Sequence, residues 1–221
     1  MSDLPGEVGG PEDAVAETSA VYDLIAEDYE TRTRQTSPEY ALFREQFIVA
    51  LPRGGTVLDV GCGPGRDAGF FRKAGLLCFG LDLSEAMLRL ACRSTSVVRG
   101  DLRALPVRSN CLDGIWSGAS LLHVPREQVR ATLDGWHGAL SPGGVAGLST
   151  SVGHDEGWEL VPAREDHRIN EPSVRRWFVH HDPDDLCSLV QSAGFDVVSA
   201  ATRVSHRTWV QVLARKCPPR Q

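Results

Sequence analysis

The sequence predicts an α/β domain, in which helices alternate with the strands of a mainly parallel sheet. Three neighbouring features support this fold class. A β-branched and aliphatic run, Thr56–Val60, is typical of a buried parallel strand. A glycine-rich turn at residues 61–65 follows it directly and leads into a helical pattern. A second apolar run, residues 76–81, then ends in the acidic residue Asp82.

The glycine turn and Asp82 together predict a nucleotide site. A strand, a glycine turn and a helix let the backbone pass close to a ligand while helix N–H groups point at it. An acidic residue at the end of the second strand can accept hydrogen bonds from both hydroxyls of a ribose. The spacing argues against the dinucleotide fingerprint G-x-G-x-x-G, because its third glycine would fall at Arg66. The run beginning at Asp59 is instead D-V-G-C-G-P-G.

The first fifty residues indicate a tail and two helices. Residues 1–16 are rich in Gly, Pro and acids, and we expect them to be a disordered tail. Apolar residues recur at helical spacing after Ser19, which is a suitable helix cap. A second amphipathic pattern covers residues 38–50. Residues 17–50 therefore predict a helical cover, and residues 51–217 the main domain.

Strand and helix patterns continue to alternate after Asp82. Ser84 is expected to cap the next helix. The expected elements are a helix ending at Cys92, strands at 96–99 and 112–117, a helix at 126–140 ended by the Ser-Pro-Gly-Gly run 141–144, a strand at 145–150, a helix capped by Asp182 or Asp184, and strands at 196–202 and 208–215.

The segment 151–181 between the fifth strand and the next helix is polar, irregular and rich in histidine, arginine and tryptophan. Irregular segments of this length are more often functional than not. We therefore expect it to be an insertion that recognises a ligand. His180 and His181 are adjacent, so their side chains would point to opposite faces of a strand, and we do not expect a metal site there.

Composition limits the classes of partner. A length of 221 residues suits one well-buried α/β domain with small additions. The net charge of −6 argues against nucleic acid and anionic membranes as partners. No apolar run is long enough to span a bilayer, and no secretory signal is evident. Six cysteines form no C-x-x-C or zinc spacing, which predicts reduced thiols and a cytoplasmic location.

The acidic-x-Gly-x-Gly-x-Gly run, placed between strand and helix and followed by Asp82, resembles motif I and the second-strand acid of the class I S-adenosylmethionine (SAM)-dependent methyltransferases, in particular their small-molecule, secondary-metabolite type. The resemblance covers nearly the whole chain after the tail, with its specific motifs in residues 55–123. It implies a Rossmann-like seven-stranded sheet of order 3-2-1-4-5-7-6, with strand 7 antiparallel, helices on both faces and an N-terminal helical cover. It also implies SAM as the cofactor.

The resemblance assigns cofactor contacts residue by residue. The glycine loop packs against the methionine part of SAM, Asp82 holds the ribose, and Asp101 lies beside the adenine amino group. Alternative roles remain open: the two tyrosines of the set could pack the first helix, Met87 could be a core residue, and Asp101 could cap a turn. The full set is Tyr22, Tyr29, Asp59, Gly61, Cys62, Gly63, Gly65, Asp82, Leu83, Met87, Asp101, Leu102, Ser117 and Gly118. Arg32 and Arg34 are either partners of the SAM carboxylate or solvated surface residues.

The acceptor side is less explicit. Residues 117–119 end the fourth strand, at the switch point where open α/β sheets bind ligands. Residues 121–125 resemble the loop beneath the transferable methyl group, which makes His123 the candidate general base; alternatively, it holds the loop by hydrogen bonds. His154, His180 and His181 are further base candidates. Acceptor contacts are expected from Trp158, Trp177, Phe178 and His181.

The predicted activity is therefore methyl transfer from SAM to O or N of a small-molecule acceptor. The acceptor is expected to be a ring-bearing metabolite, and acidic metabolites are included. The alternatives are a tRNA or protein methyltransferase, a noncatalytic SAM-binding partner subunit and, least favoured by the glycine spacing, a nicotinamide-dependent oxidoreductase. The expected partners are the acceptor alone, without nucleic acid or membrane. The expected assembly is a monomer or homodimer.

Overall fold

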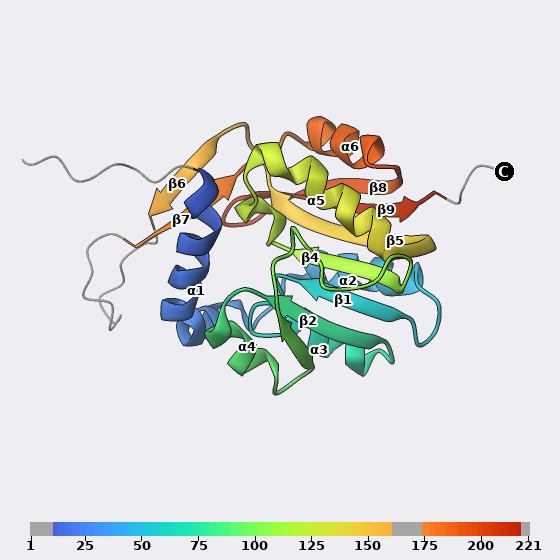
Figure 1. Cartoon of the computed structure of the whole chain (residues 1–221), viewed down its shortest axis with the longest axis horizontal. Coiled ribbons are helices and arrows are strands. Elements are labelled where there is room, and N and C mark those ends of the chain that lie inside the picture. The colour runs from blue at the N-terminus through green and yellow to red at the C-terminus, as the bar shows by residue number, and fades with distance from the viewer. Residues whose placement is uncertain (1–10, 161–173, 218–221) are drawn as a thin grey trace, which may run out of the picture.

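A computed structural model describes residues 11–160 and 174–217. Its centre is a seven-stranded sheet of order β3-β2-β1-β4-β5-β9-β8 (Figure 1). The strands are β1 (Thr56–Val60), β2 (Leu77–Asp82), β3 (Ser96–Arg99), β4 (Leu112–Gly118), β5 (Leu140–Ser151), β8 (Phe195–Val204) and β9 (Thr208–Lys216). Strands β1 to β5 are parallel, and β9 is antiparallel to both β5 and β8. This confirms the predicted order, because β8 and β9 are the sixth and seventh strands of this sheet.

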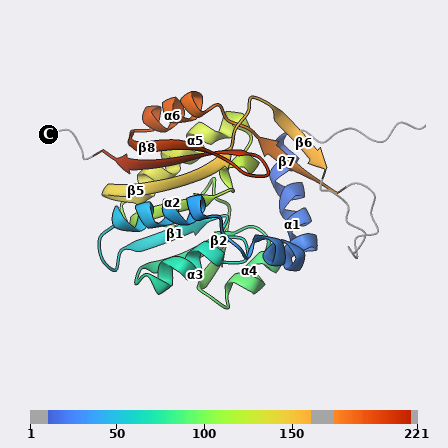
Figure 2. The ribbon, with the colours of Figure 1, turned by 180° about the vertical axis from the view of Figure 1, so that it is seen from behind.

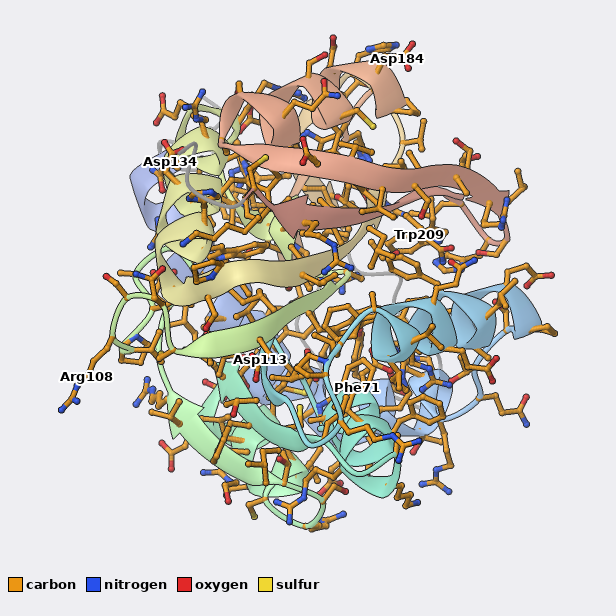
Figure 3. The ribbon with its side chains drawn as sticks, turned by 90° about the vertical axis from the view of Figure 1, so that its right-hand side faces the viewer. Phe71, Arg108, Asp113, Asp134, Asp184 and Trp209 are labelled. Atoms are coloured by element: carbon orange, nitrogen blue, oxygen red, sulfur yellow. The ribbon has the colours of Figure 1, made fainter. Side chains whose placement is uncertain are left out.

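Helices pack on both faces of the sheet (Figures 1 and 2). They are α1 (Pro11–Thr33), α2 (Pro38–Val49), α3 (Arg66–Lys73), α4 (Glu85–Ala91), α5 (Arg126–Ala139) and α6 (Pro183–Ser192), with a 3₁₀ turn η1 (Leu121–His123). Helices α5 and α6 bury Leu133, Trp136 and Leu186 against one face. Helices α2 and α3 bury Phe47 and Phe71 against the other face, and Phe71 is seen from the end of the sheet in Figure 3.

The helix caps explain several element boundaries. The Ser84 hydroxyl accepts the Met87 N–H and begins α4, as predicted. Asp182, rather than Asp184, caps α6: its carboxylate accepts N–H groups from residues 184 and 185. Ser37 caps α2, which begins at Pro38, a favoured first helical residue. The local sequence therefore sets where these helices start.

Two expected element boundaries are corrected. Helix α1 begins at Pro11 rather than at Ser19, so residues 11–16 are helical and not part of a tail, while residues 1–10 lie outside the described part. Strand β5 begins at Leu140 rather than at Val145, and it includes the run 141–144 that was expected to end the preceding helix. Its pairing with β4 shifts between Leu112 and Gly114, so the extra residues are absorbed as an irregularity of the strand.

The expected irregular insertion is partly a β-ribbon. Strands β6 (Glu156–Leu160) and β7 (Arg175–Val179) pair antiparallel as a separate two-stranded sheet. Residues 161–173 of the insertion lie outside the described part. Helix α1 lies beside β7 at the carboxyl ends of the parallel strands (Figures 1 and 2). In the described ranges, no helix has both the length and the apolar character to cross a membrane.

Candidate functional site

The glycine turn after β1 forms one wall of the site. Gly61, Gly63 and Gly65 all have positive φ, at 69°, 53° and 79°. A Cβ on Gly61 would overlap the Ser120 side chain, so this glycine is required by packing. A Cβ on Gly63 would meet nothing nearer than Tyr29 Cε1 at 3.8 Å, because Gly63 borders an open cavity. Gly63 is therefore the glycine that lets a ligand approach the backbone.

Asp82 ends β2 beside this turn. One carboxylate oxygen accepts the Gly63 N–H at 2.8 Å, and the other accepts the Ser84 N–H at 2.9 Å. Burial raises the pKa of Asp82, and these backbone hydrogen bonds oppose the rise. Each oxygen accepts one bond from the backbone and has a further lone pair, so the carboxylate can also accept ligand hydroxyls.

A first cavity, of about 90 Å³, lies over the turn and Asp82. Nine of the predicted cofactor residues line it: Tyr22, Tyr29, Gly61, Gly63, Asp82, Leu83, Met87, Asp101 and Leu102. Ligand pockets usually measure about 300–1,000 Å³. The cavity is therefore narrow, with Thr18 and Tyr22 of α1 forming part of its lining.

The other five predicted cofactor residues do not line this cavity. The buried Asp59 carboxylate accepts the Ala68 N–H of α3 at 3.1 Å. The Cys62 side chain packs with α4, and Gly65 packs against Ala91. The Ser117 hydroxyl bonds Ser120 at 2.7 Å. These residues shape the turn from behind, while the fifth, Gly118, borders a second cavity described below.

Asp101 is held by an arginine that the sequence did not indicate. Arg103 Nε and Nη2 donate to Asp101 Oδ2 at 2.9 and 2.6 Å, and Nη1 donates to Gln128 at 2.7 Å. Asp101 Oδ1 also accepts the Arg103 N–H at 2.8 Å, which is the turn-capping alternative. An adenine amino group would therefore have to share or displace the Arg103 contact.

His123 is neutral, and both of its ring nitrogens form hydrogen bonds. Its Nδ1 lies 2.5 Å from the Trp177 carbonyl oxygen, and its Nε2 lies 2.8 Å from the Tyr22 hydroxyl. A carbonyl oxygen only accepts, so Nδ1 carries the proton and Nε2 accepts from Tyr22. Burial lowers the pKa of His123 to about 3. His123 thus holds its loop by hydrogen bonds, which was the alternative to its role as a general base.

A second cavity, of about 530 Å³, opens beside the first. The two share Tyr22, Tyr29, Ala119 and His123 as lining residues. Among the residues predicted to contact the acceptor, Phe178 borders the second cavity. Arg32 also borders it and pairs with Asp28 at 2.5 Å, whereas Arg34 does not border it.

Trp158 and Trp177, which were predicted to contact the acceptor, border neither cavity. These residues are direct neighbours across the β6–β7 ribbon, with ring centroids 5.3 Å apart. Neighbouring residues of a strand alternate between faces, so Phe178 faces the cavity and Trp177 does not. The alternation was readable from the sequence, but which face of β7 meets the cavity was not.

The three other histidine candidates do not border either cavity. His180 bonds Ser151 at 2.8 Å and Glu159 at 2.7 Å. His181 is 1% exposed, and burial lowers its pKa to about 4. His154 uses its carbonyl to accept from Arg126. His181 was predicted to contact the acceptor, and in this structure its ring lies in the interior.

A buried carboxylate below the second cavity was missed by the sequence analysis. Asp67 accepts from Tyr40 at 2.6 Å, Arg44 at 3.2 Å, Arg66 at 3.1 Å and Trp116 at 3.1 Å. Burial opposes its ionisation, but the charge and hydrogen bond of Arg66 outweigh this and hold the pKa of Asp67 below its usual value. Its sole sequence signal is a place in the first turn of α3, a position favourable for an acid.

Helix α1 is held to its surroundings by hydrogen bonds of side chains that the sequence did not indicate as functional. Asp23 accepts the Ser84 hydroxyl at 2.6 Å and the Ala86 N–H at 2.9 Å. The Thr18 hydroxyl accepts the Trp177 N–H at 2.9 Å. These bonds join α1 to α4 on one side and to β7 on the other, so α1 covers both cavities.

Comparisons with known proteins agree with this geometry. Residues 57–144 match the methyltransferase domain family. The malonyl-[acyl-carrier protein] O-methyltransferase of Pseudescherichia vulneris is 31% identical over 120 residues, which cover 51% of this chain and 47% of that protein. This chain thus spans about half the length of the first curated relatives that it matches. A Saccharopolyspora spinosa dTDP-4-amino-2,3,4,6-tetradeoxy-D-glucose N,N-dimethyltransferase is 26% identical over 216 residues, 86% of this chain and 85% of that one.

A solved structure has the same fold over nearly the whole chain. It is the 1,6-didemethyltoxoflavin-N1-methyltransferase of Burkholderia thailandensis, with a TM-score of 0.73, 20% identity and coverage of 97% of this chain and 93% of that one. At this identity the likeness shows the fold alone. The domain match, the sheet order and the glycine turn agree: residues 57–144 are similar to the methyltransferase domain family, and the sheet has the fold of that methyltransferase structure.

Proposed function

We propose that this protein is a SAM-dependent methyltransferase that acts on O or N of a ring-bearing small molecule. One observation carries the proposal: a cavity over the glycine turn and Asp82 meets a second, larger cavity at Tyr22, Tyr29, Ala119 and His123. This meeting point lies just past the end of β4, where open α/β sheets bind ligands.

The residues of the first cavity fit SAM. Asp82 has lone pairs for ribose hydroxyls, and Gly63 leaves its backbone open to the cavity. The rings of Tyr22 and Tyr29 lie 5.4 Å apart, and aromatic faces attract cations. SAM, when bound, supplies a methyl group on a positively charged sulfur. The narrowness of the cavity indicates that α1 must shift to admit a ligand of this size.

The chain's own contribution is binding, alignment and exclusion of water. His123 holds the loop between the cavities and has no free lone pair, so it does not act as the base in this arrangement. Burial also raises the pKa of Tyr22 and of Tyr29. These groups are poor bases, which favours an acceptor atom that is already ionised or is a neutral amine.

The size of the second cavity favours a small molecule over a polymer. Its volume of about 530 Å³ lies within the usual range of about 300–1,000 Å³ for small-molecule pockets. The net charge of −6 argues against tRNA. We place the protein in the cytoplasm, as a monomer or homodimer. A noncatalytic SAM-binding subunit remains the competing proposal, and turnover of any acceptor decides between them.

Calorimetric titration with SAM and with S-adenosylhomocysteine, its demethylated product, tests the proposal first. A screen of phenols, carboxylates and amines with radiolabelled SAM then tests turnover. Binding of both nucleosides and label transfer to at least one acceptor class are the expected results. Failure of both nucleosides to bind would overturn the proposed function.

A further inference from the structure

The second cavity concentrates positive charge in an acidic protein. The chain has a net charge of −6, yet the cavity's lining includes five arginines and one carboxylate, that of Glu39. The arginines are Arg32, Arg66, Arg176, Arg203 and Arg207. A cavity lined by one sign of charge attracts ligands of the opposite sign.

Most of these arginines are already paired. The ion pairs are Arg32–Asp28 at 2.5 Å, Arg66–Asp67 at 3.1 Å and Arg207–Glu159 at 2.9 Å. Within residues 11–160 and 174–217, Arg176 and Arg203 form no ion pair. Arg203 is exposed to water, whereas Arg176 is half-buried. Arg176 is therefore the cation whose charge the described fold leaves uncompensated inside the cavity.

Two aromatic rings and a hydroxyl group hold the Arg176 guanidinium in place. Its guanidinium carbon lies 5.2 Å from the Tyr22 ring centroid and 5.1 Å from that of Phe178. Nη1 donates to the Tyr22 hydroxyl at 2.9 Å. Nε is buried and has no hydrogen-bond partner among the described residues. A buried, unpaired donor on a charged group is costly, so a bound anion would satisfy it.

Arg207, which is paired with Glu159, lies beside Arg176 on the same ring. Its guanidinium carbon lies 4.7 Å from the centroid of the Phe178 ring that Arg176 also contacts. The Phe178 side chain is 5% exposed, so its ring forms the wall behind the two guanidinium groups. Two adjacent guanidinium groups, of which one has no ion pair among the described residues, suit a ligand that bears an anionic group.

Resting on the proposed function, we infer that the methyl acceptor is an anionic molecule whose carboxylate or phosphate group binds to Arg176. The Arg207–Glu159 pair and the Phe178 ring form the wall beside Arg176 and hold its guanidinium in place. A guanidinium group can donate two parallel N–H bonds to either anion. The feature that a carboxylate and a phosphate share is therefore a pair of negatively charged oxygens on one atom. The inference narrows the acceptor from any ring-bearing metabolite to one with a negative charge.

Matched pairs of small probes test the inference. Aromatic carboxylates, each paired with its neutral amide or methyl ester, and aryl phosphates, each paired with its neutral dimethyl ester, are titrated into protein saturated with S-adenosylhomocysteine and followed by ligand-observed NMR. The anionic members should bind at least about tenfold more tightly than their neutral partners. Equal binding of the two, or no binding of any anionic probe, overturns the inference. Failure of S-adenosylhomocysteine to bind would instead overturn the proposed function.

Two substitutions assign the effect to one residue. Arg176→Gln should weaken anionic probes by about tenfold or more, and Arg176→Lys, which keeps the charge but loses the fork, should weaken them less. Arg203→Gln removes the same charge from the exposed rim and should change affinity by less than about threefold. Anion binding that survives Arg176→Gln in a folded protein contradicts the inference. If that variant does not fold, salt dependence decides: probe affinity that is unchanged by added salt also contradicts it.

Discussion

The cofactor cavity and the acceptor cavity are built in different ways. The first is bounded on one side by the backbone of the glycine turn and of the end of β2, and on the other side by helix α1. The second is bounded by side chains from α1, β7 and the β8–β9 turn, most of them arginine and aromatic. A site made of backbone demands particular residues at fixed spacing, because few residues adopt positive φ or leave room for a ligand. A site made of side chains can be assembled in many ways.

The largest expected effect concerns the glycine turn of the cofactor cavity. Gly63→Val should reduce S-adenosylhomocysteine affinity on the order of a hundredfold or more, because the new side chain occupies ligand space. Gly54→Val is the matched control: Gly54 also has positive φ, at 70°, and open space around it, but it lies outside the site. Both variants should lose about 1–2 kcal/mol of stability from left-handed strain. Calorimetry and urea unfolding separate the two effects, and equal affinities in the two variants would contradict the assignment.

Asp82→Ala should have the next largest effect. It removes a charge-assisted hydrogen bond worth about 1.5–3 kcal/mol, which corresponds to a tenfold to hundredfold loss of affinity for S-adenosylhomocysteine. Asp113→Ala is the control, since Asp113 also accepts a backbone N–H, that of Thr56, at 2.8 Å. Asp113 is the second residue of β4, at the opposite end of the sheet, which faces the viewer in Figure 3. Normal nucleoside binding by the Asp82→Ala protein would contradict the assignment of Asp82 to the ribose of SAM.

The same contrast explains what could be predicted from the sequence. The sheet order, the glycine turn and Asp82 were readable because strand periodicity and positive φ restrict the residues allowed. Arg176, Asp67 and Asp23 could not be predicted, since each has a partner far along the chain: 154 residues away for Arg176, 49 for Asp67 and 63 for Asp23. Trp177 was assigned to the acceptor and Arg176 was not, because alternation along β7 shows which residues share a face but not which face meets the cavity.

His123, which borders both cavities, leads to a prediction about how stability depends on pH. The pKa of His123 falls from about 6.5 in the unfolded chain to about 3 in the folded one. Between these values the unfolded chain binds a proton that the folded chain does not, so the free energy of unfolding should rise with pH and level off above 6.5. His181, whose pKa falls to about 4, should act in the same direction.

Urea unfolding at a series of pH values measures this slope. His123→Asn should flatten it, because one of the two buried histidines is gone. His206→Asn is the control, since His206 borders the acceptor cavity but its side chain is exposed. A His123→Asn protein with the slope of the parent would show that His123 titrates alike in both states, and would restore it as a candidate base.

The smallest expected effect concerns α1, the element that the two cavities share. A first cavity of about 90 Å³ is too small for a nucleoside with its methionine chain, so α1 must move away and return when ligand binds. Its polar ties to the rest of the site include those of Asp23 to Ser84 and of Thr18 to Trp177, and its buried face packs against α4. Local opening of these contacts in the absence of ligand would expose the helix N–H groups to exchange.

Hydrogen exchange of residues 19–36 should therefore slow when S-adenosylhomocysteine is added, and slow further with an acceptor. Helix α6 is the internal control, because none of its residues borders either cavity. Ligand that stabilises the whole fold protects both segments alike, by up to about 2.7 kcal/mol at a hundred times Kd. Protection of α1 beyond that of α6 indicates a cover that closes on the ligand. Equal protection of the two helices would mean that α1 is a fixed wall, and that the first cavity widens through another element, such as the loop that carries Arg103.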